Sequence, residues 1–220
     1  RPGKTIVSVG HAVVLLGMET VMMIASGLKF IEHFGRRSPG LRELITLSLL
    51  AAGQARRLAI HIGYPNPEEA HLCGLLRNLG EVLVAYYQPH QYAEILLSEE
   101  KAKLNERTAC SKVLGFSYET LAAEVLRGWN LGGKVVNCIL ANPEMIPQKV
   151  HRHDDLLRYI VAFSHLAASA IHRLDPKQSR ARLSDLLLKF GPSLDLDPKV
   201  VEGIVAGSVE DARASFAALG

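Results

Sequence analysis

Apolar residues recur at spacings of three and four along nearly the whole chain, and no segment shows a convincing run of strict alternation. The first spacing places apolar side chains on one face of an α-helix, whereas alternation would place them on one face of a β-strand. The pattern therefore predicts an all-α protein, folded as a multi-helix bundle with little or no sheet.

Capping residues and glycines indicate where these helices begin and end. Asn66-Pro67, Asp197-Pro198 and Ser208 each place a capping side chain before a helix-compatible first turn. Gly63 and Gly115 stand where a left-handed residue would close a last turn. The expected helices span residues 6–16, 18–34, 40–62, 67–86, 89–97, 99–113, 118–127, 132–140, 152–174, 181–189, 198–206 and 208–218.

A short polar stretch at residues 174–182, which contains Pro176, marks the one notable shift in composition. The segment that follows it has little apolar surface of its own, and so small a unit rarely folds alone. We expect one helical domain over residues 1–175, with residues 176–220 packed on the same core as a C-terminal helical appendage.

Composition limits the classes of function. A chain of 220 residues with 48% hydrophobic content can form a sizeable core, whereas a net charge of +3 with scattered basic residues disfavours nucleic-acid binding. Cys73, Cys110 and Cys138 lie too far apart for a C-x-x-C pair, which favours reduced thiols in the cytoplasm. No segment predicts a signal peptide or a transmembrane helix, so no membrane contact is expected.

The stretch EAHLCGLLRNLGEVL, residues 69–83, resembles the metal-binding helix of HD-type phosphohydrolases. In that superfamily the segment runs approximately A-x-L-A-G-L-L-H-D-I-G, and the adjacent His and Asp bind the metal. Here these two positions hold Arg77 and Asn78. Arg has a permanent positive charge and no lone pair to donate, and the Asn carboxamide is a neutral substitute for an anionic ligand.

Three further segments resemble HDOD domains, bacterial signalling modules related to the HD phosphohydrolases. TIVSVGHAVVLLGMETV is similar to the family's I-x-S-I-x-x-A-I-x-x-L-G, and LITLSLLAAGQARRLA to L-W-x-H-S-x-x-x-A, with Leu47 in place of the His. GFSYETLAAEVLRGWNL is similar to G-x-x-H-x-x-x-G-x-x-L-x-x-W-x-L, with Tyr118 in place of the His. The resemblance covers residues 5–170 and implies an HD-like helical bundle. The family's usual opening helices would precede Ile6, so we expect an N-terminally incomplete module.

The resemblance also implies that the metal site is degenerate. Its four positions hold Leu47, Arg77, Asn78 and, where YIVAFSHLAASA would be expected to contain an Asp, His165. One His cannot hold a divalent ion against water. We therefore expect no metal, no other cofactor and no catalytic residue, and hence a protein that is not an enzyme.

Two interpretations of Arg77 and Asn78 remain open. They could be solvated residues on the outer face of an amphipathic helix. Alternatively they line a polar pocket, and Arg77 pairs with Glu81 one helical turn later, because a buried guanidinium needs a partner. The second interpretation, which we favour, gives a candidate ligand or partner pocket of Arg77, Asn78, Glu81, Tyr118 and His165.

Other conspicuous residues have simpler interpretations. The cluster His151, His153, Asp154 and Asp155 is interpreted as a helix start rather than a metal site, because side chains two apart on a helix diverge. Trp129 and Tyr118 are predicted to be packing residues, and Cys73 a small core residue.

Three classes of function follow. The first is a non-catalytic bacterial signalling or regulatory module that binds other signalling proteins or domains, with a homodimer as a further candidate. The second is a sensor that binds a nucleotide or cyclic dinucleotide at the degenerate site, with Arg77 facing a phosphate. The third, and least favoured, is a metal-dependent phosphohydrolase, because that chemistry requires an ion to generate hydroxide.

Overall fold

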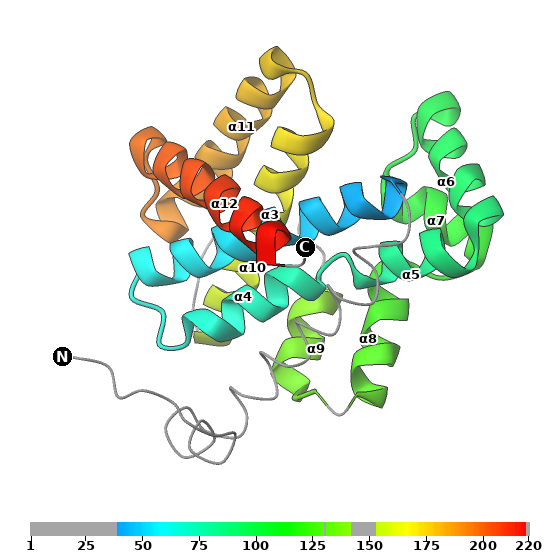
Figure 1. Ribbon diagram of the computed structural model, residues 1–220, viewed down its shortest axis with the longest axis horizontal. Coiled ribbons are helices and arrows are strands. Elements are labelled where there is room, and N and C mark those ends of the chain that lie inside the picture. Colours follow the sequence, from blue (N-terminus) through cyan, green and yellow to red (C-terminus); the bar gives the residue numbers. More distant parts are fainter. Residues whose placement is uncertain (1–38, 130, 142–152, 219–220) are drawn as a thin grey trace.

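The structure is a computed structural model that describes residues 39–129, 131–141 and 153–218 (Figure 1). Every regular element among these residues is an α-helix, as the periodicity predicts. The helices are α3 (Pro39–His61), α4 (Pro67–Leu76), α5 (Leu79–Tyr87), α6 (Pro89–Ala102), α7 (Glu106–Leu114), α8 (Tyr118–Gly128), α9 (Gly133–Leu140), α10 (His153–Arg173), α11 (Pro176–Leu194) and α12 (Pro198–Ala218).

Helix α3 lies at the centre of the fold and packs against α4, α10 and α12. Its middle turns are apolar on almost every side, which is typical of a helix surrounded by protein. One buried cluster joins Leu47 of α3 to Leu76 and Leu79. A second joins Leu58 of α3 to Phe163 and other residues of the C-terminal helices. The two clusters share α3, so this helix connects the halves of the core.

The C-terminal helices are fixed to α3 and α10 by both apolar and charged contacts. Phe190 of α11 packs edge-on against Tyr159 and Phe163 of α10, with ring centroids 6.0 and 5.9 Å apart. Arg57 of α3 donates two hydrogen bonds to Asp211 of α12, at 2.9 and 3.0 Å. Helices α11 and α12 therefore pack on the same body as the helices that precede them.

Helices α6 and α7 form a hairpin that projects from this body (Figure 1). A third, smaller cluster attaches it: Ile95 of α6 and Cys110 of α7 pack with Val84 of α5 and Tyr118 of α8. Lys103, which ends α6, has a left-handed backbone with φ of 50°. Among the described residues, no helix has the length and apolar character that a bilayer crossing requires.

Several predicted boundaries are wrong. The helix expected at 67–86 is divided into α4 and α5, and the break expected near residue 98 falls after Ala102 instead. The helices expected at 198–206 and 208–218 are one helix, α12. Ser208 is not a cap: it is fully buried against Gly53, and its hydroxyl donates to the Val205 carbonyl at 2.8 Å. The segments expected at 6–16 and 18–34 lie outside the described residues.

Candidate functional site

The helix that resembles a metal-binding helix bends at the two residues in question. Asn66 caps α4 by accepting a hydrogen bond from the Glu69 amide at 3.2 Å, and the helix ends at Leu76. Asn78 has a non-helical ψ of 6°, and α5 begins after it. Arg77 and Asn78 thus occupy the bend, and both are buried, which excludes the solvated outer face for them.

Arg77 forms a buried ion pair with the first turn of α8. Its Nη2 lies 3.1 Å from Oε1 of Glu119, and the two side chains are 5% and 7% exposed. Burial would raise the pKa of Glu119, but Arg77 and a hydrogen bond from Ser117 more than offset this and lower it below its ordinary value. Glu119 is therefore a buried carboxylate whose negative charge is balanced mainly by Arg77.

The prediction that Arg77 pairs with Glu81 is wrong about the partner. The i,i+4 spacing brings two side chains together only along a continuous helix, and the bend between α4 and α5 interrupts it. Glu81 is instead bound by Arg173 at the end of α10, whose Nη2 lies 2.8 Å from each carboxylate oxygen. Tyr92 of α6 donates a further hydrogen bond to Glu81 at 3.0 Å.

Arg173 also links the hairpin to the body. Its Nη1 lies 3.6 Å from Oε2 of Glu106, the first residue of α7. Burial and the nearby negative charge of Glu81 raise the pKa of Glu106 to about 7, although Arg173 opposes this. The three carboxylates Glu81, Glu106 and Glu119 thus surround the two guanidinium groups of Arg77 and Arg173.

Among the described residues, one buried polar atom in each of His165, Asn78 and Tyr118 has no hydrogen-bond partner. His165 lies on α10, and burial lowers the pKa of its imidazole well below 6.5, with further lowering from Arg77 and Arg173. The ring is therefore neutral in the folded protein. Within the described part of the chain, Nδ1 of His165, Nδ2 of Asn78 and Oη of Tyr118 are buried without a hydrogen bond. Such groups are costly, so they mark a site where further polar contacts would stabilise the protein.

Gly80 sets the distance between α5 and α8. A Cβ atom at this position would lie 2.0 Å from the carbonyl oxygen of Tyr118. Only a residue without a side chain allows this approach, and the approach places Tyr118 beside Glu81 and Glu119 beside Arg77. The glycine in the RNLG sequence is therefore required by packing.

These residues do not fit a divalent cation. Leu47 is fully buried in the apolar core, and Arg77 offers a positive charge. Of the four aligned positions only His165 supplies a ligand type that transition metals favour. No three His, Cys, Asp or Glu side chains converge as a metal site among the residues that the structure describes.

The structure places Arg77 and Asn78 between α4 and α5, Glu81 on α5, Tyr118 on α8 and His165 on α10. It brings Arg77 near His165 and Tyr118 near Glu81, and it adds neighbours that the sequence did not reveal. Glu119, Arg173, Glu106 and Tyr92 complete the network. Glu119 directly follows Tyr118 in the quoted motif, and Arg173 lies eight residues, or slightly more than two turns, after His165 on the same helix.

The remaining predictions have mixed outcomes. Tyr118 and Cys73 are buried as expected, but Trp129 is 43% exposed, so its prediction as a core residue is wrong. Trp129 lies at the C-cap of α8, beyond the last buried turn. In the predicted helix start, Oδ1 of Asp155 lies 3.5 Å from Nη1 of Arg158, about one turn later. His151 and the side chains of His153 and Asp154 lie outside the described residues.

Comparison with known proteins agrees with this architecture. The HDOD domain model matches residues 1–145. A protein from Shewanella amazonensis SB2B, named provisionally as a phosphohydrolase, is 19% identical with a TM-score of 0.66, over 94% of this chain and 77% of its own. An HDOD domain protein of unknown function from Geobacter sulfurreducens is 20% identical with a TM-score of 0.66, over 99% of this chain and 76% of its own. No curated protein sequence matches the chain.

The described part of the chain is an all-α domain, and three of the four positions that resemble metal-binding positions of HD phosphohydrolases hold Leu47, Arg77 and Asn78. The chain belongs to the HDOD domain family, as the family match over residues 1–145 shows. The two solved structures, at 19% and 20% identity, support the fold alone.

Proposed function

We propose that this chain is a non-catalytic regulatory module of bacterial signalling, located in the cytoplasm, which acts by binding other signalling proteins or domains. The observation that carries the proposal is the buried ion pair of Arg77 and Glu119, at the position where the HD superfamily has a metal-binding His. Arg77 is permanently charged and is already paired with Glu119.

The charge arrangement disfavours metal-dependent hydrolysis by these residues. A hydrolytic metal centre needs several neutral or anionic ligands around an ion that activates water. The carboxylates nearest to the aligned positions, Glu119 and Glu81, are bound by Arg77 and Arg173. A divalent cation would have to displace a guanidinium group to reach either of them.

A sensor of nucleotides or cyclic dinucleotides is the second candidate, and one observation favours it. The buried polar atoms of Asn78, Tyr118 and His165 have no hydrogen-bond partner in the described part of the chain, so a ligand could satisfy them. The same ion pairs count against it, because a phosphate would compete with Glu119 for Arg77. We therefore place this function second.

Hydrolysis and metal dependence test the non-catalytic part of the proposal. The purified protein is incubated with Mg²⁺, Mn²⁺ or Fe²⁺ and with bis(p-nitrophenyl) phosphate or a cyclic dinucleotide. We expect rates equal to those without protein, and a melting temperature that EDTA does not change. Turnover that a chelator abolishes, and that is lost in an Asn78→Leu variant, would contradict the proposal.

Thermal shift measurements with a panel of guanine and adenine nucleotides separate the two candidates. A regulatory module of the proposed kind shows no shift at millimolar nucleotide. A saturable increase that an Arg77→Met variant lacks would establish the sensor instead, provided that a phosphate-free nucleoside gives no increase.

Binding experiments in the source bacterium test the interaction part. Proteins retained by the tagged chain are compared with those retained by a tag alone and by a Leu97→Glu variant, because Leu97 is an exposed apolar residue. We expect at least one signalling protein that the variant does not retain and that binds the purified chain directly. The absence of any protein above the tag control would contradict this part.

A further inference from the structure

Two of the three cysteines meet in the folded chain. Cys73 on α4 and Cys138 on α9 lie in one buried cluster, and both are free thiols. The Cys73 thiol is hydrogen-bonded to the Cys138 thiol, which itself donates to the Leu157 carbonyl at 3.9 Å. The two residues are far apart in the sequence, and no spacing motif joins them. The fold therefore creates a pair of adjacent thiols that the sequence did not reveal.

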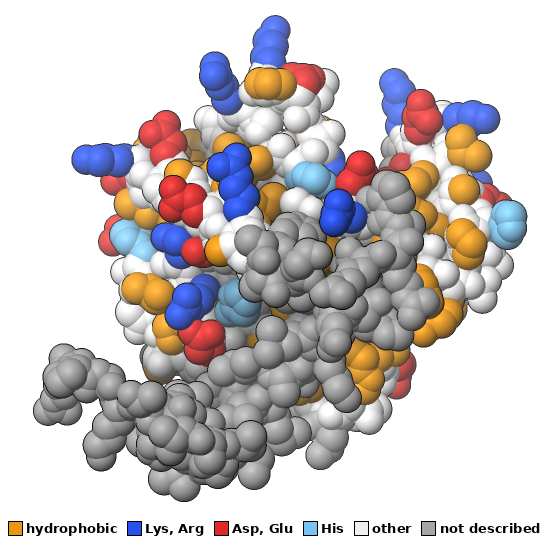
Figure 2. All heavy atoms as spheres, viewed as in Figure 1, with side chains coloured by type: hydrophobic (Ala, Val, Ile, Leu, Met, Phe, Trp, Pro, Cys, Tyr) orange, Lys and Arg blue, Asp and Glu red, His pale blue; other side chains and the backbone are white. Residues whose placement is uncertain are grey.

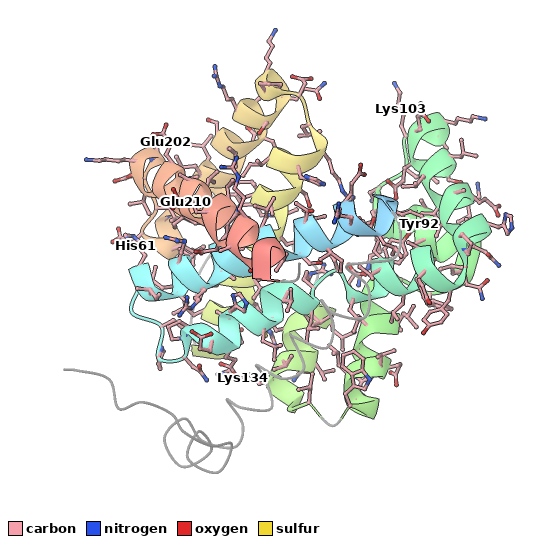
Figure 3. All side chains as sticks on the ribbon, viewed as in Figure 1. His61, Tyr92, Lys103, Lys134, Glu202 and Glu210 are labelled. Atoms are coloured by element: carbon pink, nitrogen blue, oxygen red, sulfur yellow. The ribbon has the colours of Figure 1, made fainter. Side chains whose placement is uncertain are left out.

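A salt bridge one helical turn away sets the register of the two helices. Nζ of Lys134 on α9 lies 3.1 Å from Oε2 of Glu69 on α4, and Figure 3 shows Lys134 beside α4. Cys73 follows Glu69 by four residues, and Cys138 follows Lys134 by four residues. Residues four apart lie on the same face of a helix. The two helix faces that the ion pair joins are therefore the faces that carry the two thiols.

Tyr64 strengthens this link between α4 and α9. Its hydroxyl donates to Oε2 of Glu69 at 2.7 Å, and Nζ of Lys134 lies 5.5 Å from the centre of its ring. The contact between the two helices therefore does not depend on the thiols alone. It holds the helices in register while the two sulfurs approach to the roughly 2 Å of a disulfide.

Both thiols lie beneath the surface. Cys73 is 0% exposed and Cys138 is 3% exposed, and charged side chains of both signs lie over α4 and α12 on the face shown in Figure 2. The contact with Cys138, together with burial, raises the pKa of the Cys73 thiol well above its ordinary value, so its thiolate is scarce at neutral pH. A protein oxidant cannot bring its own sulfur into contact with such a pair, whereas a small molecule needs only a local opening. The pair therefore stays reduced until a small oxidant is abundant.

We propose that Cys73 and Cys138 are a site of oxidative modification, at which hydrogen peroxide closes the two thiols of the folded chain to a disulfide that joins α4 to α9. The sulfur of Cys138, the more exposed of the two, attacks one peroxide oxygen. The O–O bond breaks, the departing hydroxide takes the thiol proton as water, and Cys138 becomes a sulfenic acid. The sulfur of Cys73 then attacks the sulfenic sulfur: the S–S bond forms, the S–O bond breaks, and the Cys73 proton leaves in a second water. Two thiols are oxidised, and one peroxide is reduced to two waters.

The surroundings favour a disulfide over a metal ion at this pair. A structural zinc site needs about four ligands. The carboxylate of Glu69 already accepts hydrogen bonds from Tyr64 and Lys134. Among the residues that the structure describes, the two cysteines do not belong to any group of three or more metal-binding side chains. Disulfide formation needs only the two sulfurs.

The bridge would close a long loop of the chain. Cys73 and Cys138 bracket the segment that contains α5 to α8, and with it Arg77 and Glu119. A disulfide around such a loop restricts the unfolded chain and thereby stabilises the folded one. The oxidised domain is therefore expected to melt at least about 5 °C above the reduced domain.

Peptide mapping of the oxidised protein gives the first test. The full 220-residue chain is treated in its folded state with hydrogen peroxide, freed of the oxidant, denatured in the presence of iodoacetamide and digested. We expect a pair of peptides linked through Cys73 and Cys138, which dithiothreitol separates. Cys110, which lies in a different buried cluster, is expected to be alkylated. Recovery of Cys73 and Cys138 only as separate peptides, at every peroxide concentration, would overturn the proposal.

Protein oxidised in urea is the control for the folded geometry. Without the fold, no pair of thiols is held together, so linked peptides that include Cys110 are expected. The same mixture of links from the folded protein would overturn the proposal, as would a covalent dimer on a non-reducing gel in place of a cross-linked monomer.

Melting followed by circular dichroism tests the effect of the bridge. Cys110→Ala retains the pair, and Cys73→Ala is the matched variant that lacks it. Peroxide is expected to raise the melting temperature of Cys110→Ala by at least about 5 °C, and dithiothreitol to reverse the rise, whereas Cys73→Ala shows no rise. A cross-linked chain that melts no higher than the reduced chain would overturn the proposal that the folded structure accommodates the bridge. Mapping of the wild type decides the proposal even where a variant does not fold, and neither test depends on partner binding or hydrolysis.

Discussion

Replacing Arg77 by Met tests whether the buried ion pair holds the site together. The variant removes the guanidinium and leaves Glu119 buried, 7% exposed; Arg107, whose Nε lies 3.8 Å from Oε2 of Glu119, is then its one remaining ion-pair partner among the described residues. Removing one member of a buried pair typically costs about 3–5 kcal/mol of unfolding free energy. Because Arg107 is partly exposed and offsets some of the charge, we expect about 3 kcal/mol. For a chain of this size this corresponds to a fall in melting temperature of roughly 6–12 °C.

A double-mutant cycle separates the pair from other effects of the substitution. Denaturant unfolding is measured for the wild type, Arg77→Met, Glu119→Gln and the double variant. We expect the double variant to lose at least about 2 kcal/mol less than the sum of the two single losses, because removal of both charges leaves none unpaired. The control is Arg127→Met on α8, which removes an exposed pair with Glu124 and is expected to cost less than about 1 kcal/mol. If Arg77→Met costs no more than this control, the ion pair does not stabilise the fold and our reasoning is refuted.

Three further predictions concern packing and pH. Gly80→Ala is expected to lower the free energy of unfolding by about 3 kcal/mol or more, because its Cβ would clash with the Tyr118 carbonyl oxygen. The control is Gly133→Ala, which has open space around it and should be nearly neutral. Equal effects of the two variants in denaturant unfolding would refute the close approach of α5 and α8. The pKa of His165 is depressed, so the stability that its neutral form contributes is present above pH 6.5 and lost below it. The advantage of wild type over His165→Asn should then shrink by up to about 1.4 kcal/mol per pH unit on acidification, and a constant difference would contradict this. The raised pKa of Glu106 has the opposite sign: stability falls as pH rises from 4.5 through about 7, and ¹³C NMR titration should find a carboxyl pKa of about 7 that is absent from Glu106→Gln.

The all-helical fold could be predicted because its main signal is local. Apolar spacing and the caps at Asn66 and Asp197 depend on residues within one or two turns, and the structure has helices at both positions. Ser208 shows where local reasoning fails. The same capping pattern occurs there, but burial of Ser208 against Gly53 of α3 favours a continuous helix. Contact with a distant helix outweighs the local preference at that position.

The sequence pointed to some residues of the site but not to the partners of its charged side chains. The resemblance to HD-type motifs selected Arg77, Tyr118 and His165, and the structure places His165 near Arg77 and Tyr118 near Glu81. The bend after Leu76 was not predicted, because no proline or consecutive glycines mark it in the sequence. On a continuous helix, Glu81 would lie one turn from Arg77 and would be its expected partner. The actual partner, Glu119, is 42 residues further along the chain and reaches Arg77 only because Gly80 lets α8 approach α5.

The pairing of Arg77 with Glu119 also restricts how the sequence can change over evolutionary time. A single mutation that removes the charge of either residue leaves the other charge buried without its partner, so the single variant is less stable than the original protein. A lineage that exchanged Arg77 for a ligand such as His would first have to neutralise Glu119 or gain a compensating cation. Introducing a metal ligand at position 77 would therefore require at least two coordinated substitutions.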